Sequence, residues 1–237
     1  MKRSAEMKKI KKAGKYFMTV LLVATLLFTW CAQSTVTVSA ASKATYTIKK
    51  ITQKKSYKKV SASYLYELPQ LKGSSAAVKK INKSLKKDYQ KDQENRESLF
   101  DWFESSKNYG YERAFVSHTT CSASYNQNGY ISFRYGVNWY VGTAVYAYEY
   151  GKTYRLRDGK ELGIQDVVAG KASNVKKTIA TKYAKEVAER GYSYIMKMNL
   201  SDFQFFLMPG KKVIVYFGPI QPMGGHGPAQ ITLKSKM

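Results

Sequence analysis

Cysteine, histidine and acidic residues are all scarce in this chain of 237 residues. It contains two cysteines and two histidines, and its 16 acidic residues stand against 40 basic ones. Two cysteines allow at most one disulfide, which excludes the class of small secreted proteins held together by several disulfides. His118 and His226 are far apart, and no His/Cys/Asp cluster has the spacing of a metal site. We therefore expect neither a metal nor a cofactor.

The first 40 residues have the composition of a secretory signal. Seven basic residues and one acidic residue lie within 2–15, an apolar run follows from Tyr16 to Ala32, and Val38-Ser39-Ala40 ends the segment. A basic head, an apolar middle and a small-residue exit are typical of a segment that a signal peptidase removes. We expect cleavage near Ala40, and a mature chain of residues 41–237 that is secreted or associated with the cell surface.

Two other interpretations of this segment stay open. An uncleaved apolar run would act as an N-terminal anchor. Cys31 would be a lipid-attachment site, but such sites need a small residue before the cysteine and Trp30 stands there. After cleavage near Ala40, Cys121 is the remaining cysteine, and its place in an alternating stretch predicts a small buried side chain rather than a reactive thiol.

The predicted mature chain is strongly basic. The first 40 residues hold 7 of the 40 basic and 1 of the 16 acidic residues, which leaves 33 basic against 15 acidic residues and a formal charge of +18. Such a charge attracts polyanions, which outside a bacterium are teichoic acids and anionic lipid headgroups rather than nucleic acid. We expect an anionic cell-wall polymer or a secreted protein as the partner. The alternative is that the lysines only solvate exposed faces.

Hydrophobic periodicity predicts a single α+β domain over residues 41–237, with a largely antiparallel sheet and two main helices. The helices are expected near 75–104, with Ser74 or Ser75 as N-cap, and near 173–190, with Gly191 at the C-cap. Strands are predicted at 45–48, 60–66, 112–125, 131–137, 143–150, 153–157, 203–207, 212–217 and 230–233. Asn128-Gly129 predicts a hairpin turn, and Asp158-Gly159 predicts another turn.

The order of short motifs in the chain is similar to that of a known family. The motifs are Tyr66–Leu71 before a helix with Val78, Ile81 and Asn82, then Thr153–Leu162, Ile164–Val168, Asp202-Phe203, Val213–Phe217 and Ile231–Leu233. In this order and spacing the chain resembles the extracellular domain of the lysozyme-sensing anti-sigma factors of Gram-positive bacteria. The same domain precedes some secreted peptidoglycan deacetylases. The resemblance covers about residues 45–234 and implies a sensing or binding role at the cell surface.

Two departures from the family limit what the resemblance implies. The family commonly has a Gly-Ala-His-like segment before its Tyr-x-Leu-x-x-Gly turn, and here that place, Gly142–Tyr146, has no histidine. Only 15 residues precede the apolar run, too few for the cytoplasmic sigma-binding region of the anti-sigma factors. Lysozyme is the ligand that the resemblance implies. Common animal lysozymes are cationic like this chain, so we expect weak binding or none.

Catalytic motifs are absent from the sequence. No Gly-x-Ser-x-Gly elbow occurs, and the catalytic set of the polysaccharide deacetylases is missing. Asp166 and Asp202 are candidates for paired-carboxylate glycosidase chemistry, but each stands at the start of an element, where a carboxylate more often caps the backbone. We therefore predict no catalytic residue. The alternative is an enzyme that acts on wall glycan through Asp166, Asp202 or His226.

Aromatic side chains are present in surplus, with 20 tyrosines in the chain. Five aromatic residues, one tryptophan and four tyrosines, crowd one stretch: Trp139, Tyr140, Tyr146, Tyr148 and Tyr150. A tyrosine joins an apolar ring to a polar tip, which suits sugar rings and protein partners alike. We predict that these five side chains, with His226 from a glycine-rich loop, form the ligand site of a non-catalytic binding domain. The alternatives are that about half of the rings fill the core and that His226 belongs to an ordinary turn.

Overall fold

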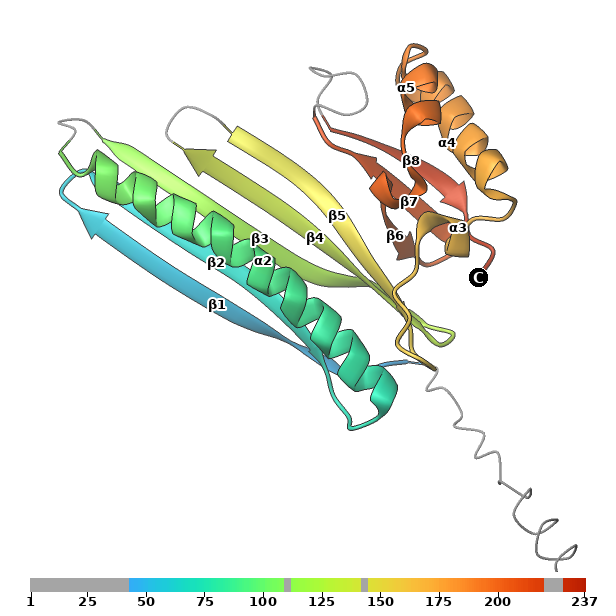
Figure 1. Cartoon of the computed structure of the whole chain (residues 1–237), viewed down its shortest axis with the longest axis horizontal. Coiled ribbons are helices and arrows are strands. Elements are labelled where there is room, and N and C mark those ends of the chain that lie inside the picture. Colours follow the sequence, from blue (N-terminus) through green and yellow to red (C-terminus); the bar gives the residue numbers. More distant parts are fainter. Residues whose placement is uncertain (1–42, 109–111, 142–144, 220–227) are drawn as a thin grey trace, which may run out of the picture. The chain divides into compact units, whose positions relative to one another are not determined.

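Two β-sheets with helices packed on them make up the described part of the chain (Figure 1). The computed structural model describes residues 43–108, 112–141, 145–219 and 228–237, all of which lie in one compact unit, Ala40–Met237. The predicted α+β class, with largely antiparallel pairing and two main helices, is confirmed. The sequence suggested one sheet, whereas the described residues form two.

The first sheet contains five strands in chain order: β1 (Tyr46–Tyr57), β2 (Val60–Leu71), β3 (Arg113–Gln127), β4 (Tyr130–Val141) and β5 (Val145–Arg155). Every neighbouring pair is antiparallel except β2 and β3, which are parallel. The helix α2 (Ala76–Ser106) supplies the long crossover that a parallel pair requires. The two strands predicted at 143–150 and 153–157 are one continuous strand, β5.

Helix α2 packs along one face of this sheet (Figure 1). Ser75 caps its first turn, since the Ser75 hydroxyl accepts a hydrogen bond of 3.2 Å from the Val78 N–H. Its buried stripe includes Ile81, Leu85 and Phe103, which meet inward side chains of the strands. The predicted limits, 75–104, are therefore close to those observed.

The β3–β4 hairpin turns at Asn128-Gly129, as predicted. Asn128 has φ 55° and Gly129 has φ 79°, a left-handed pair that these two residue types tolerate. Near Ser124 a bulge shifts the β3–β4 register. Because of this shift, Cys121 faces the core under α2, while Tyr125 packs into the core of the second sheet.

The second sheet contains β6 (Gln204–Met208), β7 (Lys212–Phe217) and β8 (Ala229–Lys234), all antiparallel. Its core also receives side chains from α3 (Ile164–Val167), α4 (Ala172–Glu186) and α5 (Gly191–Lys197), and the 3-10 turn η1 (Leu200–Asp202) precedes β6. The predicted helix over 173–190 was too long. The N–H groups of Val187 and Ala188 both bond to the Tyr183 carbonyl, which ends α4, and Gly191 begins α5 instead of capping α4.

The two sheets meet closely at the C-terminal half of β5. The Ser132 hydroxyl accepts a 3.0 Å hydrogen bond from the Leu207 N–H of β6 and lies 2.8 Å from the Thr153 hydroxyl. A Cβ atom at Gly151 would lie 1.8 Å from the Phe205 carbonyl oxygen, so only glycine permits this approach. Among the residues described, no helix is both long and apolar enough to cross a membrane.

Candidate binding site

Strand β5 forms one edge of the five-stranded sheet and carries three of the predicted tyrosines. Its ladder with β4 places Tyr146 opposite Trp139, Tyr148 opposite Val137 and Tyr150 opposite Tyr135. Successive side chains of a strand point to opposite faces, so these tyrosines share the α2 side of the sheet. Ala147 and Glu149 lie on the other side, which we call the open side.

Five rings from α2, β4 and β5 lie in the contact pairs Trp102–Trp139, Trp139–Tyr146 and Tyr148–Tyr150. Tyr148 lies between Tyr146 and Tyr150 along β5 and so joins these pairs into one series. We call this series the aromatic row: Trp102, Trp139, Tyr146, Tyr148 and Tyr150. The ring centroids are 5.3 Å apart for Trp102–Trp139, 5.6 Å for Trp139–Tyr146 and 6.4 Å for Tyr148–Tyr150. Trp102, Tyr146 and Tyr148 are 41%, 43% and 40% exposed. Exposed neighbouring rings of this kind form a platform on which a ligand can stack.

The row becomes deeper toward Tyr150. This ring stacks on buried Tyr135 at a centroid distance of 4.6 Å, and burial raises the pKa of the Tyr150 hydroxyl. Tyr140 lies in register with Val145, on the open side and apart from the row. His226 lies outside the described residues. The structure thus brings together four of the six predicted site residues.

Trp102 belongs to the row but was not predicted as a site residue. In the sequence it lies in one apolar run with Leu99, Phe100 and Phe103, which suggested a core position. Those three side chains are buried, whereas Trp102 points out of the core toward Trp139. Helical spacing gave no signal for this, because Trp102 stands three residues after Leu99 and both three- and four-residue spacings belong to the apolar stripe of a helix.

A crevice of about 190 Å³ separates the inner end of the row from α2. The polar residues that line it from the helix are Asp88, Lys91, Asp92 and Asn95. The Tyr64 hydroxyl donates a 2.7 Å hydrogen bond to Asp92, and the Asn95 amide donates one of 3.0 Å to the same carboxylate. This crevice therefore sets amide and carboxylate groups beside tyrosine rings.

Lys152 closes the crevice from β5. Its ammonium lies 3.1 Å from Asp88 and 2.9 Å from Glu161. Burial alone would lower the pKa of Lys152, but these two carboxylates outweigh it and raise the pKa. The lysine therefore stays charged and is bound to partners of its own.

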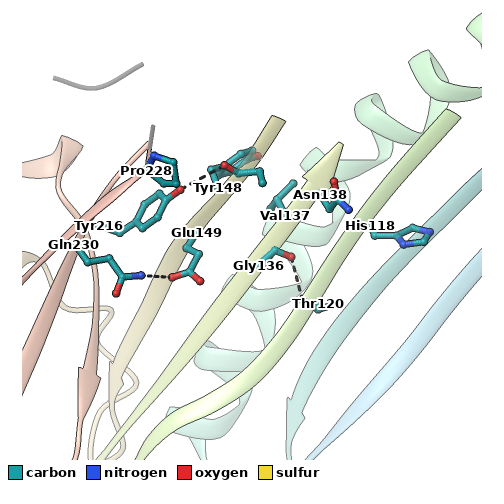
Figure 2. Close-up of a pocket in the computed structure, with 11 residues that line it drawn as sticks. His118, Thr120, Gly136, Val137, Asn138, Tyr148, Glu149, Tyr216, Pro228 and Gln230 are labelled. Carbon is teal, nitrogen blue, oxygen red and sulfur yellow. Dashed lines mark hydrogen bonds between the residues drawn. The ribbon is translucent and has the colours of Figure 1, made fainter. Parts of the chain in front are cut away.

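On the open side, a larger cleft of about 530 Å³ lies between the first sheet and strands β7 and β8 (Figure 2). Short residues on three neighbouring strands form its floor: Thr120, Gly136 and Ala147. Its polar lining includes His118, Asn138, Glu149, Tyr216 and Gln230. The acidic member, Glu149, is paired with Arg134 and accepts a 2.8 Å hydrogen bond from the Gln230 amide. The cleft therefore presents neutral polar groups.

His118 lies at one end of this cleft, with its Nε2 2.9 Å from the Ser63 hydroxyl. Burial and the nearby Lys54 lower the pKa of the imidazole. A serine beside a neutral histidine is the first part of a nucleophilic site. However, no carboxylate in the described part of the chain bonds to the other ring nitrogen. Both residues lie on inner strands whose main-chain donors pair within the sheet, so none is left for an oxyanion hole.

Asp166 and Asp202, the predicted alternatives for catalysis, each bond to a nearby backbone N–H. Asp166 accepts hydrogen bonds from the Gly163 N–H at 3.0 Å and from Lys160 at 2.9 Å, and Asp202 accepts one from the Asn199 N–H at 2.9 Å. Burial alone would raise the pKa of Asp166, but its hydrogen bonds lower the pKa, whereas a glycosidase acid needs it raised. The geometry matches the capping interpretation.

Among the described residues the one cysteine, Cys121, is buried and forms no disulfide. Burial raises the pKa of the Cys121 thiol to about 12, which keeps it protonated and unreactive. Within 43–108, 112–141, 145–219 and 228–237, no three His, Cys, Asp or Glu side chains gather in a way that would hold a metal ion.

Comparisons with known proteins give the fold alone. No protein-family profile matches the sequence, and no curated protein matches it. A DUF3298 family member from Bacteroides fragilis superimposes with a TM-score of 0.57 at 9% identity, over 81% of this chain and 91% of that one. A DUF3298 family protein from Pseudomonas aeruginosa gives a TM-score of 0.45 at 9% identity, over 80% and 90% of the two chains, which is too distant to carry an argument.

This chain therefore has a DUF3298-like fold. The resemblance to the lysozyme-sensing anti-sigma factors stays a prediction.

Proposed function

We propose that the mature chain is a secreted, non-catalytic binding domain of the bacterial cell surface that holds sugar rings of a wall polymer on the aromatic row. The observation that carries this proposal is the row itself, in which three rings, one from α2 and two from β5, are about 40% exposed. Apolar faces of sugar rings stack on such platforms. A monomeric domain has no structural need to leave them uncovered.

The α2 crevice supplies the polar half of the site. Sugar hydroxyls need donors and acceptors placed beside the stacking ring, and Asp92, Asn95 and Lys91 lie opposite Tyr148. Because the Tyr64 hydroxyl already holds Asp92, the carboxylate keeps its orientation when the crevice is empty. A preformed group of this kind reduces the ordering that binding requires.

Besides Lys91 in the crevice, positive charge gathers on strand β1 and on the first half of α2. The lysines are Lys49, Lys50, Lys54 and Lys55 on the strand and Lys79, Lys80, Lys83, Lys86 and Lys87 on the helix. They would attract the phosphate groups of an anionic polymer whose sugars reach the row. That contribution is screened by salt, so affinity for teichoic-acid-bearing walls should fall as ionic strength rises.

Cosedimentation with purified sacculi tests this proposal. The variant Trp102→Ala/Tyr146→Ala removes two exposed rings, each worth about 1 kcal/mol, so binding should weaken about tenfold or more. The matched control is Tyr192→Ala/Tyr194→Ala, which removes two exposed rings from α5. Equal binding by both double variants would rule out the row as the site.

Two further measurements bear on the rest of the proposal. N-terminal sequencing of the secreted protein should begin near Ala41, and a retained N-terminus would indicate an anchor. Purified peptidoglycan incubated with the protein should release no muropeptides and undergo no deacetylation. Turnover that disappears in Asp166→Asn or Asp202→Asn would instead establish the enzyme alternative.

A cationic protein such as lysozyme is the second candidate ligand, because the second half of α2 is acidic beside Trp102. The acids are Asp88, Asp92, Glu94, Glu97, Asp101 and Glu104. Four of them already pair with other side chains: Asp88 with Lys152, Asp92 with Tyr64, Glu97 with Arg96, and Glu104 with Lys55. We therefore expect weak binding, and tight, salt-insensitive calorimetric binding of lysozyme would make this the function.

A further inference from the structure

We propose that the outer edge of β5 at Val145–Tyr148 is a strand-addition site, which takes one extended polypeptide segment as an antiparallel sixth strand. This goes beyond the proposed function, because the ligand is a polypeptide main chain and the contact is the strand edge rather than the rings. The argument rests on main-chain geometry, on the cavities beside the edge and on the charge of the two sheet edges.

Alternate residues of β5 direct their main-chain hydrogen-bonding groups outward, away from β4. The register of β5 with β4 is continuous from Val145 to Arg155, so alternate residues direct both N–H and C=O away from β4. Thr153 and Arg155 are outward residues, since they bond to Leu162 and Lys160 outside the sheet. By alternation, Val145 and Ala147 are outward residues too.

The opening is limited to the N-terminal half of the strand. Farther along, Phe205 packs against Gly151, and Leu162 bonds to Thr153. The Ala147 carbonyl oxygen accepts a hydrogen bond from the Tyr216 hydroxyl (Figure 2). Its length of 3.5 Å is at the limit for a hydrogen bond. Val145 is 65% exposed. Apart from the Ala147 carbonyl, the outward main-chain groups of Val145 and Ala147 therefore have no main-chain partner among the described residues, and an added strand would satisfy them.

Cavities lie on both sides of this edge, as an added strand requires. Toward the α2 side, Tyr146 and Tyr148 line a cavity of about 270 Å³ that reaches round the edge to Glu149. Its other lining residues are Gln204, Tyr216, Gly218 and Pro219. On the open side lies the neutral polar cleft with Asn138 and Gln230. Side chains of an added strand alternate between the two, so apolar residues would enter the first and small polar residues the second.

Charge favours a single polypeptide segment over a second copy of this chain. Two copies, each with a formal charge of +18 after cleavage, repel one another. Tyr216 and Pro219 also lie across the cavity from β5. The strands beyond the first in a second copy's sheet would collide with them. The open edge itself carries no lysine, whereas lysine is the usual protection of an edge against strand addition.

The probe is a fluorescein-labelled peptide of four Val-Thr repeats, followed by fluorescence anisotropy. In antiparallel addition the threonines lie opposite Val145 and Ala147 and donate their N–H groups to β5. N-methylation of the threonines should therefore weaken binding about tenfold or more, while N-methylation of the valines changes it less than about threefold. Both methylated peptides keep the same side chains, which makes them matched controls.

The protein variant Ala147→Pro removes one outward N–H, and an edge strand tolerates proline there. It should weaken peptide binding by a similar factor, while Ala147→Ser, which keeps the N–H, binds like the wild type. Equal loss with both methylated peptides, or no saturable binding up to about 1 mM, would overturn the proposal. Dimerisation in sedimentation that Ala147→Pro abolishes would identify a second copy as the occupant instead. Sacculus binding, which depends on Trp102, should survive Ala147→Pro, so failure of one proposal does not mimic failure of the other.

Discussion

The two edges of the five-stranded sheet, β1 and β5, are built from opposite chemistry. Strand β1 carries four lysines among its 12 residues: Lys49, Lys50, Lys54 and Lys55. Lys50 pairs with Glu67, and Lys55 pairs with Glu104. Strand β5 carries tyrosines at its open end and meets the second sheet at its other end. One edge is thus protected by charge, and the other is partly covered by protein and partly left free.

This difference indicates which edge is available for function. Lysines on an edge oppose pairing with another strand and keep the chain soluble, so β1 has the features of an edge that does not bind another strand. The open end of β5 lacks that protection and has cavities on both sides. Three variants test this contrast.

Gly151→Ala should have the largest effect, because it pushes apart the covered half of β5 and β6. The new Cβ would lie 1.8 Å from the Phe205 carbonyl oxygen, and a backbone atom cannot move aside cheaply. We expect the free energy of unfolding to drop by about 3 kcal/mol or more in urea titrations. The control Gly136→Ala meets only the Thr120 side chain at 3.2 Å and should cost less than about 1 kcal/mol. Equal losses would mean that the closure at Gly151 is not tight.

Replacement of all four β1 lysines by threonine should remove the protection of that edge. The variant is expected to form concentration-dependent oligomers that light scattering detects, with little change in the stability of the monomer. The control replaces Lys79, Lys80, Lys83 and Lys86 of α2 by glutamine, which changes the net charge equally without touching an edge. Oligomers in both variants would show that net charge, rather than edge protection, opposes self-association.

The smallest effect concerns His118, whose pKa is lowered by burial and by the nearby charge of Lys54 on β1. Its folded pKa lies below the ordinary value of 6.5, so the unfolded chain binds more protons between the two values. The free energy of unfolding should therefore fall as pH drops from 6.5 through this window, and His118→Gln should flatten that slope. NMR titration should show the His118 pKa rising in Lys54→Ala. An unchanged pKa would leave burial as the whole cause.

Local signals predicted the elements whose causes are local. The Asn128-Gly129 turn and the Ser75-capped helix α2 are confirmed because a dipeptide or a periodic stripe determines them. The parallel β2–β3 pair and the separation into two sheets were not predicted, since pairing across a 31-residue helix leaves no local pattern. Gly151 interrupts the pattern of β5, which was therefore predicted as two strands. A glycine is needed there because the Phe205 backbone, some fifty residues later in the chain, lies too close for a Cβ atom.

The same division holds for the candidate site. Alternation along 143–150 placed the tyrosines correctly on one side of the strand. Trp102 was missed because its neighbours in sequence are core residues. The open-side cleft could not be predicted at all, because one wall consists of Tyr216 and Gln230 from the second sheet.

The bulge in β3 has a consequence for how the molecule unfolds. On one side of it Cys121 belongs to the core under α2, and on the other Tyr125 belongs to the core of the second sheet. One continuous strand is therefore part of both cores, and neither can melt without drawing hydrophobic surface out of the other. Such sharing favours a single cooperative transition over stepwise loss of the two sheets.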